Sequence, residues 1–372
     1  AQVVIGDESL YQDLKEELTG TEIDVAAGRQ ALVEAAMRPS DLVLASIVGM
    51  AGLEPTMAAA ERGTIVGLAN KEGLVCAGTM LMEAVQQNGG ALIPVDSEHN
   101  AIFQVFNFRQ ADSVERLILT ASGGPFRESP INEMSRATPQ QAVAHPNWDM
   151  GAKISVDSAT MMNKGLELIE AYFLFPVRED QIDILVHPQS VVHSMVEYVD
   201  GSVLAQLGSP DMRTPISYAL SWPTRMATPS PRLQLDKIAN LTFEAPDPER
   251  FPAMRLGVFP TVAPFLLPEL LGEIRDLYPE FKLYIREALS QPLLEALQAG
   301  GTAPAILNAA NEVAVRYFLD ESIGFLDICG IVADVLAEMP PVALDTMDAV
   351  YEIDTEARAL AEKLAKRLAS AK

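Results

Sequence analysis

The stretch that organises this chain is HPNWDMGAKISVDSATMMNKGLELIE, residues 145–170. From Ser158 onward its polar residues recur at three- and four-residue steps, which predicts a helix with Asn163 and Glu167 on one face. With the neighbouring Lys164, that face offers an amide, a carboxylate and an ammonium. Such a face can hold a polyoxygenated anion together with a hard metal ion. The alternative is a solvated helix side with capping residues.

A second acidic cluster lies upstream, in PVDSEHN (residues 94–100), directly after the apolar run ALIPV. Open α/β sheets bind ligands at the carboxyl ends of their strands, so carboxylates in this position favour a site. Together with Glu167, the side chains of Asp96 and Glu98 suit Mg²⁺ or Mn²⁺, which prefer oxygen ligands.

Composition bounds the class of protein. The 372 residues carry a net charge of −24, which argues against a binder of nucleic-acid backbones. An apolar fraction of 49% predicts a globular chain of two or three domains. No apolar run approaches 18 residues and no leader pattern is present, so we expect no membrane partner and a cytoplasmic location. Cys76 and Cys329 indicate neither a disulfide framework nor a zinc site.

Residues 1–95 alternate strand and helix patterns. AQVVIG, TEIDVAAG, DLVLASIVG and TIVGLAN are typical of buried strands, which predicts a parallel, doubly wound sheet. No G-x-G-x-x-G follows the first strand; the nearest approach is IVGMAG (47–52). We therefore expect a nucleotide-type domain that is incomplete at its N-terminus.

Two further segments offer polar groups after strands. In Asn70-Lys71-Glu72, Lys71 can meet a phosphate or a sugar hydroxyl and Glu72 a ribose; the alternative is an ordinary polar helix start. In ASGGPFR (121–127), glycines free backbone N–H groups and let Ser122 approach an anion; the alternative is a plain turn.

The segment from Arg127 to Gly151 is polar and rich in proline, which predicts a mobile lid carrying His145 and Trp148. Trp148 has the alternative of a core position. Two strand-like runs follow, 183–199 and 201–208, joined by the hairpin pair Asp200-Gly201.

The predicted domains are consecutive. They comprise a partial nucleotide domain (1–95), an α+β catalytic, metal-binding and dimerising domain (96–222), a linker rich in proline (223–252) and a C-terminal helical domain (253–372).

Five motifs in one order, PVDSEHN, ASGGPFR, HPNWDMGAKISVDSATMMNKGLE, HPQSVVHSM and GSVLAQLGSPDMRTPI, resemble those of the 1-deoxy-D-xylulose 5-phosphate reductoisomerase family. The resemblance implies a homodimer with an NADPH domain, a catalytic domain and a helical C-terminal domain. It implies conversion of the phosphorylated ketose to 2-C-methyl-D-erythritol 4-phosphate, in non-mevalonate isoprenoid biosynthesis.

The resemblance also implies roles for single residues. Metal ligands would be Asp96, Glu98 and Glu167. Substrate-binding positions would be Lys71, Ser97, Glu98, Ser122, His145, Ser158, Asn163, Lys164 and Glu167. NADPH would contact Asn70, Glu72 and Gly151, with Met212 near the nicotinamide. Catalytic positions would be Lys71, Glu98, His145, Trp148 as a lid residue, and His193. From its sequence position alone, His193, like His187, has the alternative of a structural histidine on a sheet.

Two departures from the family pattern are expected to matter. The glycine-rich βαβ unit is missing, so reduction by NADPH should be impaired even where metal and substrate bind. Residues 257–293 are similar to the opening of the effector domain of LysR-type regulators, and predict a foreign insert.

Three hypotheses follow from these patterns. The first is a reductoisomerase that uses NADPH and Mg²⁺ or Mn²⁺. The second is a metal-dependent sugar-phosphate isomerase or aldolase without a nicotinamide. The third is a non-catalytic binder of metal and sugar phosphate, or a regulator built around the insert.

Overall fold

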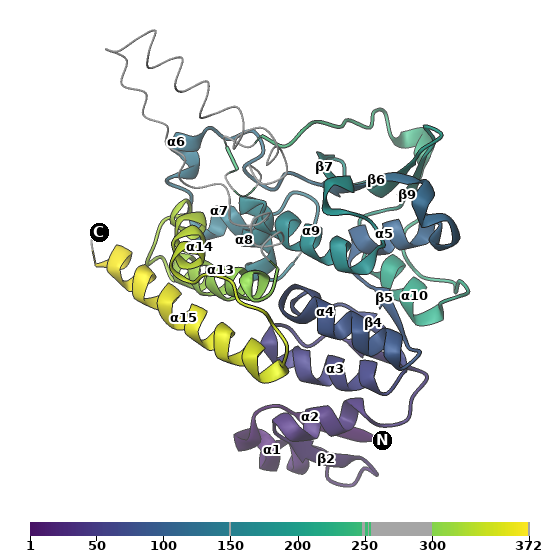
Figure 1. Cartoon of the computed structure of the whole chain (residues 1–372), viewed down its shortest axis with the longest axis vertical. Helices are drawn as coiled ribbons and strands as arrows, with labels where there is room; N and C mark the ends of the chain where they lie inside the picture. Colours follow the sequence, from purple (N-terminus) through teal and green to yellow (C-terminus); the bar gives the residue numbers. More distant parts are fainter. Residues whose placement is uncertain (149, 248–249, 252, 254–299, 371–372) are drawn as a thin grey trace. The chain divides into compact units, whose positions relative to one another are not determined.

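The computed structural model describes residues 1–148, 150–247, 250–251, 253 and 300–370 (Figure 1). The predicted insert at 257–293 lies outside the described residues. Two compact units are present. The first comprises Ala1–Thr120, Leu166–Asp183 and His187–Thr242, and the second comprises Ala121–Gly165, Ile184–Val186 and Phe243–Lys372. Each unit is assembled from separate stretches of chain.

The N-terminal part of the first unit alternates strands and helices, as predicted. Its strands are β1 (Gln2–Ile5), β2 (Asp24–Ala27), β3 (Leu42–Ala45), β4 (Ile65–Leu68) and β5 (Ala91–Pro94). Its helices are α1 (Tyr11–Glu17), α2 (Arg29–Ala36), α3 (Leu53–Glu61) and α4 (Glu72–Gln87), with 3-10 turns at Glu8–Leu10 and Met50–Gly52. Asp7 caps the first of these turns, because its side chain accepts from the Ser9 amide at 2.9 Å.

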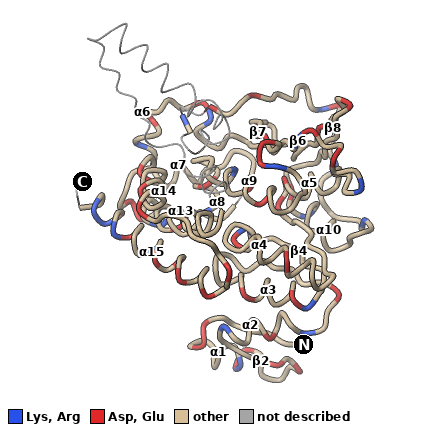
Figure 2. Tube along the Cα trace, in the orientation of Figure 1, with Lys and Arg blue, Asp and Glu red and all other residues tan. Residues whose placement is uncertain are grey.

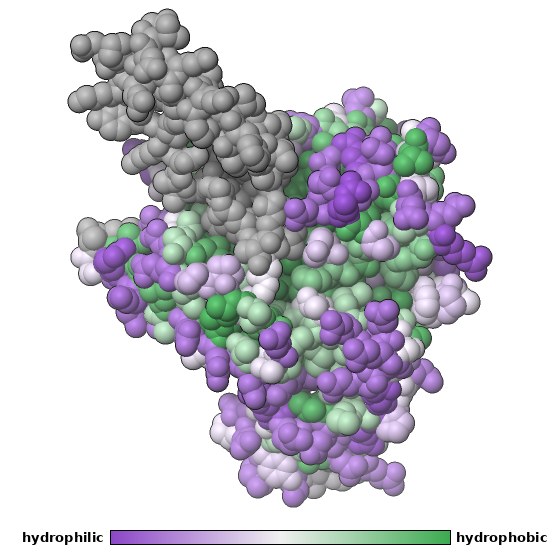
Figure 3. Space-filling model, in the orientation of Figure 1, coloured by the Kyte–Doolittle hydropathy of each residue, from purple (hydrophilic) through white to green (hydrophobic). Residues whose placement is uncertain are grey.

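All five strands pair in parallel, but they form two hydrogen-bonded sheets where we expected one. One sheet is β1-β2 and the other is β3-β4-β5. Short apolar runs of similar character do not specify which strand is their neighbour, so the division was not visible in the sequence. In Figure 3 the surface around β1, β2, α1 and α2 is predominantly hydrophilic, and α1 has no buried residue.

The second half of the first unit is built around an antiparallel sheet of order β7-β6-β8-β9. Its strands are β6 (Val114–Ala121), β7 (Ile182–Val186), β8 (Val192–Tyr198) and β9 (Val203–Leu207), and its helices are α5 (Ser97–Val105), α9 (Met162–Leu174) and α10 (Arg213–Ser221). A 3-10 turn spans Phe108–Ser113. The predicted hairpin between β8 and β9 is confirmed.

The predicted single run at 183–199 is wrong in one respect: it forms two strands, β7 and β8, with β6 lying between them in the sheet. His187 and Pro188 separate the two strands, and a proline cannot donate to a sheet ladder. The end of the predicted linker runs along β7, where Val186 and Glu244 form an isolated antiparallel bridge. This linker also contains a 3-10 turn at Leu235–Lys237.

Helix α9 packs on α4 inside the first unit through a close contact at a glycine. A Cβ atom on Gly78 would collide with the ring of Phe173 from α9. Phe175, at the end of α9, packs against Phe106 with ring centroids 5.4 Å apart. These apolar contacts fix α9, and with it Glu167, relative to the C-terminal ends of β4 and β5.

The second unit carries short helices α6 (Ile131–Met134) and α7 (Pro139–Val143), followed by α8 (Ala152–Thr160). We expected one helix from Ser158 onward, but the helix breaks at Met161, which adopts a left-handed conformation with φ of 64°. Helix α9 starts at the next residue. Because non-glycine residues seldom adopt this conformation, the sequence pattern concealed the break.

The described helices near the C-terminus are α13 (Ala303–Leu319), α14 (Asp327–Glu338) and α15 (Met347–Ala369), which confirms the predicted helical segments there. Figure 2 shows basic residues near the C-terminal end of α15, where Lys366 and Arg367 complement the partial negative charge of the helix end. Arg358 ties α15 to α13 through Glu312 at 2.7 Å. Within the described part of the chain, no helix is both long enough and apolar enough to cross a membrane.

Candidate metal and substrate site

Neighbouring parallel strands place the first two charged groups of the site. β4 and β5 pair in register, with Leu68 opposite Pro94, so the segments that follow them emerge side by side. Lys71 precedes α4 and Asp96 precedes α5, and Lys71 Nζ lies 3.9 Å from Asp96 Oδ2. Asp96 therefore lies at the carboxyl end of this sheet, where open α/β sheets bind ligands.

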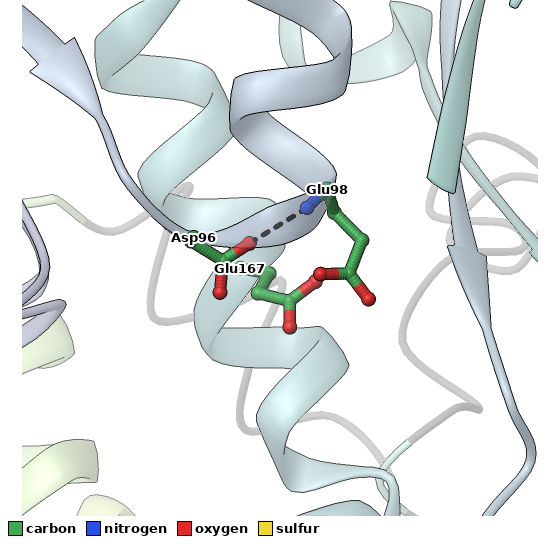
Figure 4. A group of neighbouring side chains, drawn as sticks. All are labelled: Asp96, Glu98 and Glu167. Atoms are coloured by element: carbon green, nitrogen blue, oxygen red, sulfur yellow. Dashed lines mark hydrogen bonds between the residues drawn. The ribbon is translucent and has the colours of Figure 1, made fainter. Parts of the chain in front are cut away.

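Three carboxylates meet at this point (Figure 4). Asp96 caps α5 and accepts from the Glu98 amide at 3.1 Å, while Ser97 donates its hydroxyl to Glu98 Oε2 at 2.5 Å. Glu167 reaches the same point from α9, and its side chain is fully buried. One oxygen from each of Asp96, Glu98 and Glu167 lies within 4.8 Å of the others, which is the only such cluster among the described residues.

His99 lies behind this cluster and connects the two helices that supply it. Its Nε2 is 2.8 Å from the backbone carbonyl of Glu167, and its Nδ1 is 3.4 Å from Asp96 Oδ1. Because a carbonyl oxygen only accepts, Nε2 carries the proton. The imidazole is fully buried, so this arrangement holds α5 against α9.

Lys71 and Glu170 form a buried charged pair beside the cluster, with Nζ and Oε2 4.0 Å apart. Burial alone would lower the pKa of Lys71, but Glu170, Asp96, Glu167 and Glu72 together raise it above its ordinary value. Burial raises the pKa of Glu170 to about 7, although His99 and Lys71 act in the opposite direction. The ammonium of Lys71 is therefore stabilised by the acidic groups around it.

His193 lies on β8 and is mostly buried. Burial lowers its pKa, and the nearby carboxylate of Glu98 opposes that shift. Its place beside Glu98 leaves its role as an active-site histidine a prediction. His187, by contrast, accepts from the Val191 amide at 3.2 Å and bonds the Thr242 carbonyl at 2.8 Å, which is a structural role.

Of the predicted NADPH contacts, Asn70 is the most constrained. Its amide nitrogen donates to the carbonyls of Ile47 and, at 3.1 Å, of Gly49, and its carbonyl accepts from the Gly73 amide at 3.0 Å. The side chain thus holds the loop after β3, which carries the exposed Ile47 and Val48. Glu72 is buried at the start of α4, while Met212 is exposed before α10.

The second unit brings together Ser122 and His145. His145 Nδ1 accepts from the amides of Asn147 and Trp148, at 3.2 and 3.0 Å, so Nε2 carries the proton. Nε2 then donates to Ser122 Oγ at 2.8 Å, and Gly124 donates its amide to the same oxygen at 3.2 Å. With two donors directed at its oxygen, Ser122 keeps its own hydroxyl hydrogen for an acceptor such as a phosphate.

Other predicted residues lie on or beside α8 and α9. Gly124 packs directly on α8, where a Cβ atom would lie 2.7 Å from the Ser158 carbonyl. Asn163 and Lys164 occupy the first turn of α9, and Lys164 is buried. Gly151 is the N-cap of α8, and Trp148 is half-buried, which separates it from the fully buried core residues. The predicted lid contains two short helices anchored by buried Met134 and Ala142.

Two buried residues beside the three carboxylates, His99 and Glu170, were not assigned from the sequence. Glu170 follows Glu167 by three residues on α9, which is the same step that separates Lys164 from Glu167. His99 stood within PVDSEHN, but only the fold shows that it faces α9. A periodicity argument could have found Glu170, whereas His99 required tertiary structure.

Three family models match the chain. They are described as 1-deoxy-D-xylulose 5-phosphate reductoisomerase (residues 1–78), 1-deoxy-D-xylulose 5-phosphate reductoisomerase C-terminal domain (92–175) and DXP reductoisomerase C-terminal domain (207–259 and 288–360).

Curated relatives and solved structures agree with these matches. A reductoisomerase of this name from Rhodospirillum centenum is 57% identical over 97% of this chain and 81% of the relative, and one from Zymomonas mobilis is 51% identical over 99% and 85%. The solved Zymomonas mobilis enzyme, in complex with NADPH, superimposes with a TM-score of 0.84 at 50% identity, covering 98% of this chain and 85% of that one. Another solved reductoisomerase, in complex with NADPH, fosmidomycin and magnesium, has a TM-score of 0.83 at 37% identity, covering 98% and 86%.

Neither the predicted loss of an N-terminal unit nor the predicted regulator-like insert is supported by these comparisons. Matches in sequence and in structure instead extend over nearly the whole chain, at identities far above those that show a fold alone. The chain belongs to the 1-deoxy-D-xylulose 5-phosphate reductoisomerase family.

Proposed function

We propose that this chain converts 1-deoxy-D-xylulose 5-phosphate to 2-C-methyl-D-erythritol 4-phosphate, using NADPH and a divalent metal ion. The observation that carries the proposal is the cluster of Asp96, Glu98 and Glu167 in a chain of this family. Rearrangement of a phosphorylated ketose and reduction of the product require three components in the active site. These are a cation for the ketone oxygen, a hydride source and an anchor for the phosphate.

The three carboxylates fit a hard divalent cation. Ionised carboxylates only accept hydrogen bonds, and three of them within 4.8 Å repel one another unless positive charge lies between them. An all-oxygen donor set with three protein ligands suits Mg²⁺ or Mn²⁺ and leaves coordination positions for substrate oxygens. When bound, the metal supplies Lewis-acid polarisation of the ketone and its neighbouring hydroxyl.

Lys71 and His193 would act on the substrate from beside this cluster. The acidic groups around Lys71 keep it charged, so its ammonium can bind a substrate oxygen and stabilise developing negative charge there. Burial lowers the pKa of His193, which favours a neutral ring that can donate or accept one proton near Glu98. Ser97 orients Glu98 through their 2.5 Å hydrogen bond.

The phosphate would be anchored by residues of the second unit and the start of α9. Ser122 contributes a hydroxyl whose oxygen already accepts from His145 and Gly124, so its hydrogen would be donated to a phosphate oxygen. The other proposed contacts are Ser158, Asn163 and Lys164. Hydroxyl, amide and ammonium donors together match the acceptor-only oxygens of a phosphate.

NADPH would supply the hydride that reduces the rearranged aldehyde. Two solved relatives are complexes with NADPH, which supports the cofactor for this chain. We propose contacts at Asn70, Glu72, Gly151 and Met212. For Asn70 we propose the role of holding the loop after β3 in place for the cofactor, because both of its polar groups are already bonded.

We also infer a homodimer, which rests on β9. This strand forms one edge of the antiparallel sheet, and its Val203, Leu204 and Leu207 are exposed. Adjacent residues of a strand point to opposite faces, so the apolar exposure extends over both faces of the edge. An unpaired edge strand with apolar side chains is a template for association, and a second copy would cover it by a two-fold operation.

Product analysis tests the proposed reaction. Purified protein incubated with the phosphorylated ketose, NADPH and Mn²⁺ should yield 2-C-methyl-D-erythritol 4-phosphate, with one NADPH oxidised for each product molecule. The product is identified by nuclear magnetic resonance and mass. An isomerised ketose formed without oxidation of NADPH would replace this proposal with the nicotinamide-independent isomerase.

A further inference from the structure

A buried polar contact joins α8 to the C-terminal helix α13 within the second unit. Asn311, on α13, is fully buried and donates its amide to Asp157 Oδ1 at 2.8 Å. Asp157, on α8, is itself 1% exposed and has Lys153 Nζ at 3.0 Å on its other oxygen. The two helices pack against each other, side by side in Figure 1.

The carboxylate is adjacent in sequence to a proposed phosphate contact. Asp157 directly precedes Ser158 in the last full turn of α8, so any shift of the Asp157 backbone moves Ser158 with it. Gly124 rests on the same turn, at the Ser158 carbonyl and the Ala159 Cα. Since Gly124 also donates to Ser122 Oγ, the placement of α8 sets the position of both serines.

Stability alone does not account for a carboxylate and an amide at this interface. Apart from Asn308 and Asn311, the buried residues of α13 are apolar, and replacing a buried polar pair by packed apolar residues is often neutral or stabilising. Moreover, Asn311 Oδ1 has no hydrogen-bond partner, which costs free energy that an apolar residue would not. A directional bond to Asp157 is what the amide adds, and it fixes the register of α8 against α13.

We propose that Asn311 and Asp157 are positioning residues for the substrate phosphate: their hydrogen bond fixes α8 so that Ser158 and the loop carrying Ser122 present their donors at the spacing of one phosphate. This inference rests on the proposed function for the identity of the substrate. It assigns the C-terminal helices a role in substrate affinity, in addition to their role in folding. Neither residue contacts the substrate in this account.

The chain offers a matched control on the same helix. Asn308 is also fully buried on α13 and also has an unpartnered Oδ1, but its amide donates to Glu312 of its own helix at 3.1 Å. Asn308→Leu and Asn311→Leu therefore each remove one fully buried side-chain amide from α13. Only Asn311→Leu also removes the hydrogen bond between α13 and α8. Asp157→Asn keeps an oxygen acceptor for the Asn311 amide, whereas Asp157→Leu does not.

The experiment measures KM and kcat for the phosphorylated ketose, inorganic-phosphate binding by ³¹P titration, Mn²⁺ affinity and melting temperature. Asn311→Leu and Asp157→Leu should raise KM and the phosphate dissociation constant together, by about tenfold or more, because a small misplacement of a binding group is costly. The effect on kcat should be smaller, and Mn²⁺ affinity should not change. Asn308→Leu and Asp157→Asn should keep KM within about twofold of the wild type.

Equal KM increases for Asn311→Leu and Asn308→Leu would overturn the inference, as would a lower melting temperature without a change in phosphate affinity. If Asn311→Leu does not fold, Asn311→Ser is measured in its place, because the shorter serine side chain also loses the hydrogen bond to Asp157. Failure of the proposed function has a different signature. The wild type would then not turn over the ketose, while the phosphate titration would still compare the variants.

Discussion

Burial and neighbouring charges determine the charge states of the residues at and beside the three carboxylates. Glu167 is fully buried, and Lys71 and Glu170 are held within 4.0 Å of each other where water cannot screen their charges. Burial raises the pKa of Glu170 to about 7, yet the same acidic surroundings keep Lys71 charged. A divalent cation among Asp96, Glu98 and Glu167 would offset the repulsion between their carboxylates.

Glu167→Gln tests the metal ligand at the residue scale. The substitution keeps the shape but replaces an anionic ligand by a neutral amide, so Mn²⁺ affinity should fall by about 100-fold or more. The metal-free melting temperature should stay nearly unchanged, since the substitution relieves repulsion among carboxylates. Calorimetric titration measures the affinity, with the exposed Glu133→Gln as control. Unchanged Mn²⁺ binding by the Glu167 variant would show that the site lies elsewhere.

Trp148→Ala tests the predicted lid residue. If its indole covers the substrate, removing it should weaken binding of the phosphorylated ketose and of the phosphonate fosmidomycin by about tenfold or more. Mn²⁺ affinity should stay the same. Trp222, which packs on the core formed by Ile93, Val95 and Ala219, provides the contrast. Trp222→Ala should lower the melting temperature with little direct effect on affinity, and the same outcome for Trp148 would make it a core residue.

At the scale of elements, the junction of α8 and α9 determines the site. Met161 ends α8 in a left-handed conformation, and α9 then carries Asn163 and Lys164 in its first turn and Glu167 in its second. Two helices meeting at this residue point their polar groups in directions that one continuous helix would not. The spacing of Asn163 and Glu167 was predictable from the sequence, whereas the break was not, since methionine gives no signal for positive φ.

The same limits apply to the strands. The apolar runs that became β1 to β5 were recognisable because buried parallel strands are continuously apolar. Their division into two sheets depends on pairing between distant segments, which no local pattern encodes. For the run at 183–199, Pro188 marked the point of division, and it was the one local signal that sequence reasoning did not use.

Gly124→Ala tests the contact between the ASGG loop and α8. Gly124 has φ of 66°, so alanine there costs about 1–2 kcal/mol in backbone energy, and its Cβ would also press on Ser158 and Ala159. Gly201, with φ of 82° and open space around it, carries only the backbone cost. Gly124→Ala should therefore lower the melting temperature more than Gly201→Ala and raise KM for the ketose. Equal stability losses with unchanged KM would contradict the packing described here.

At the scale of the whole molecule, β9 supplies the surface for the inferred homodimer. Leu204→Lys places a charge on this edge, 49% exposed in the single chain, and should convert dimers to monomers at micromolar concentration. Sedimentation velocity measures the change. Leu235→Lys, at a 62% exposed site in the 3-10 turn Leu235–Lys237, should remain dimeric. A wild-type protein that sediments as a monomer would refute the dimer.

The sequence was informative about the candidate site as a whole because its motifs are local. Asp96 and Glu98 follow one strand and Glu167 lies on one helix, so residue types and spacing indicated oxygen ligation before any fold was known. Local patterns could not show which residues from distant segments contact the site and hold it in place. Asn311 lies 154 residues from Asp157, and His99 lies 68 residues from Glu167.

The metal dependence of NADPH oxidation tests the central claim most directly. Purified protein is freed of metal by chelation, supplied with NADPH and 1-deoxy-D-xylulose 5-phosphate, and followed at the nicotinamide absorbance as Mn²⁺ is returned. The three-carboxylate site predicts no oxidation without metal, full recovery as Mn²⁺ saturates the wild type, and negligible recovery for Glu167→Gln at the same concentrations. Oxidation of NADPH that continues in the metal-free protein, or that recovers equally in the Glu167 variant, would contradict the account.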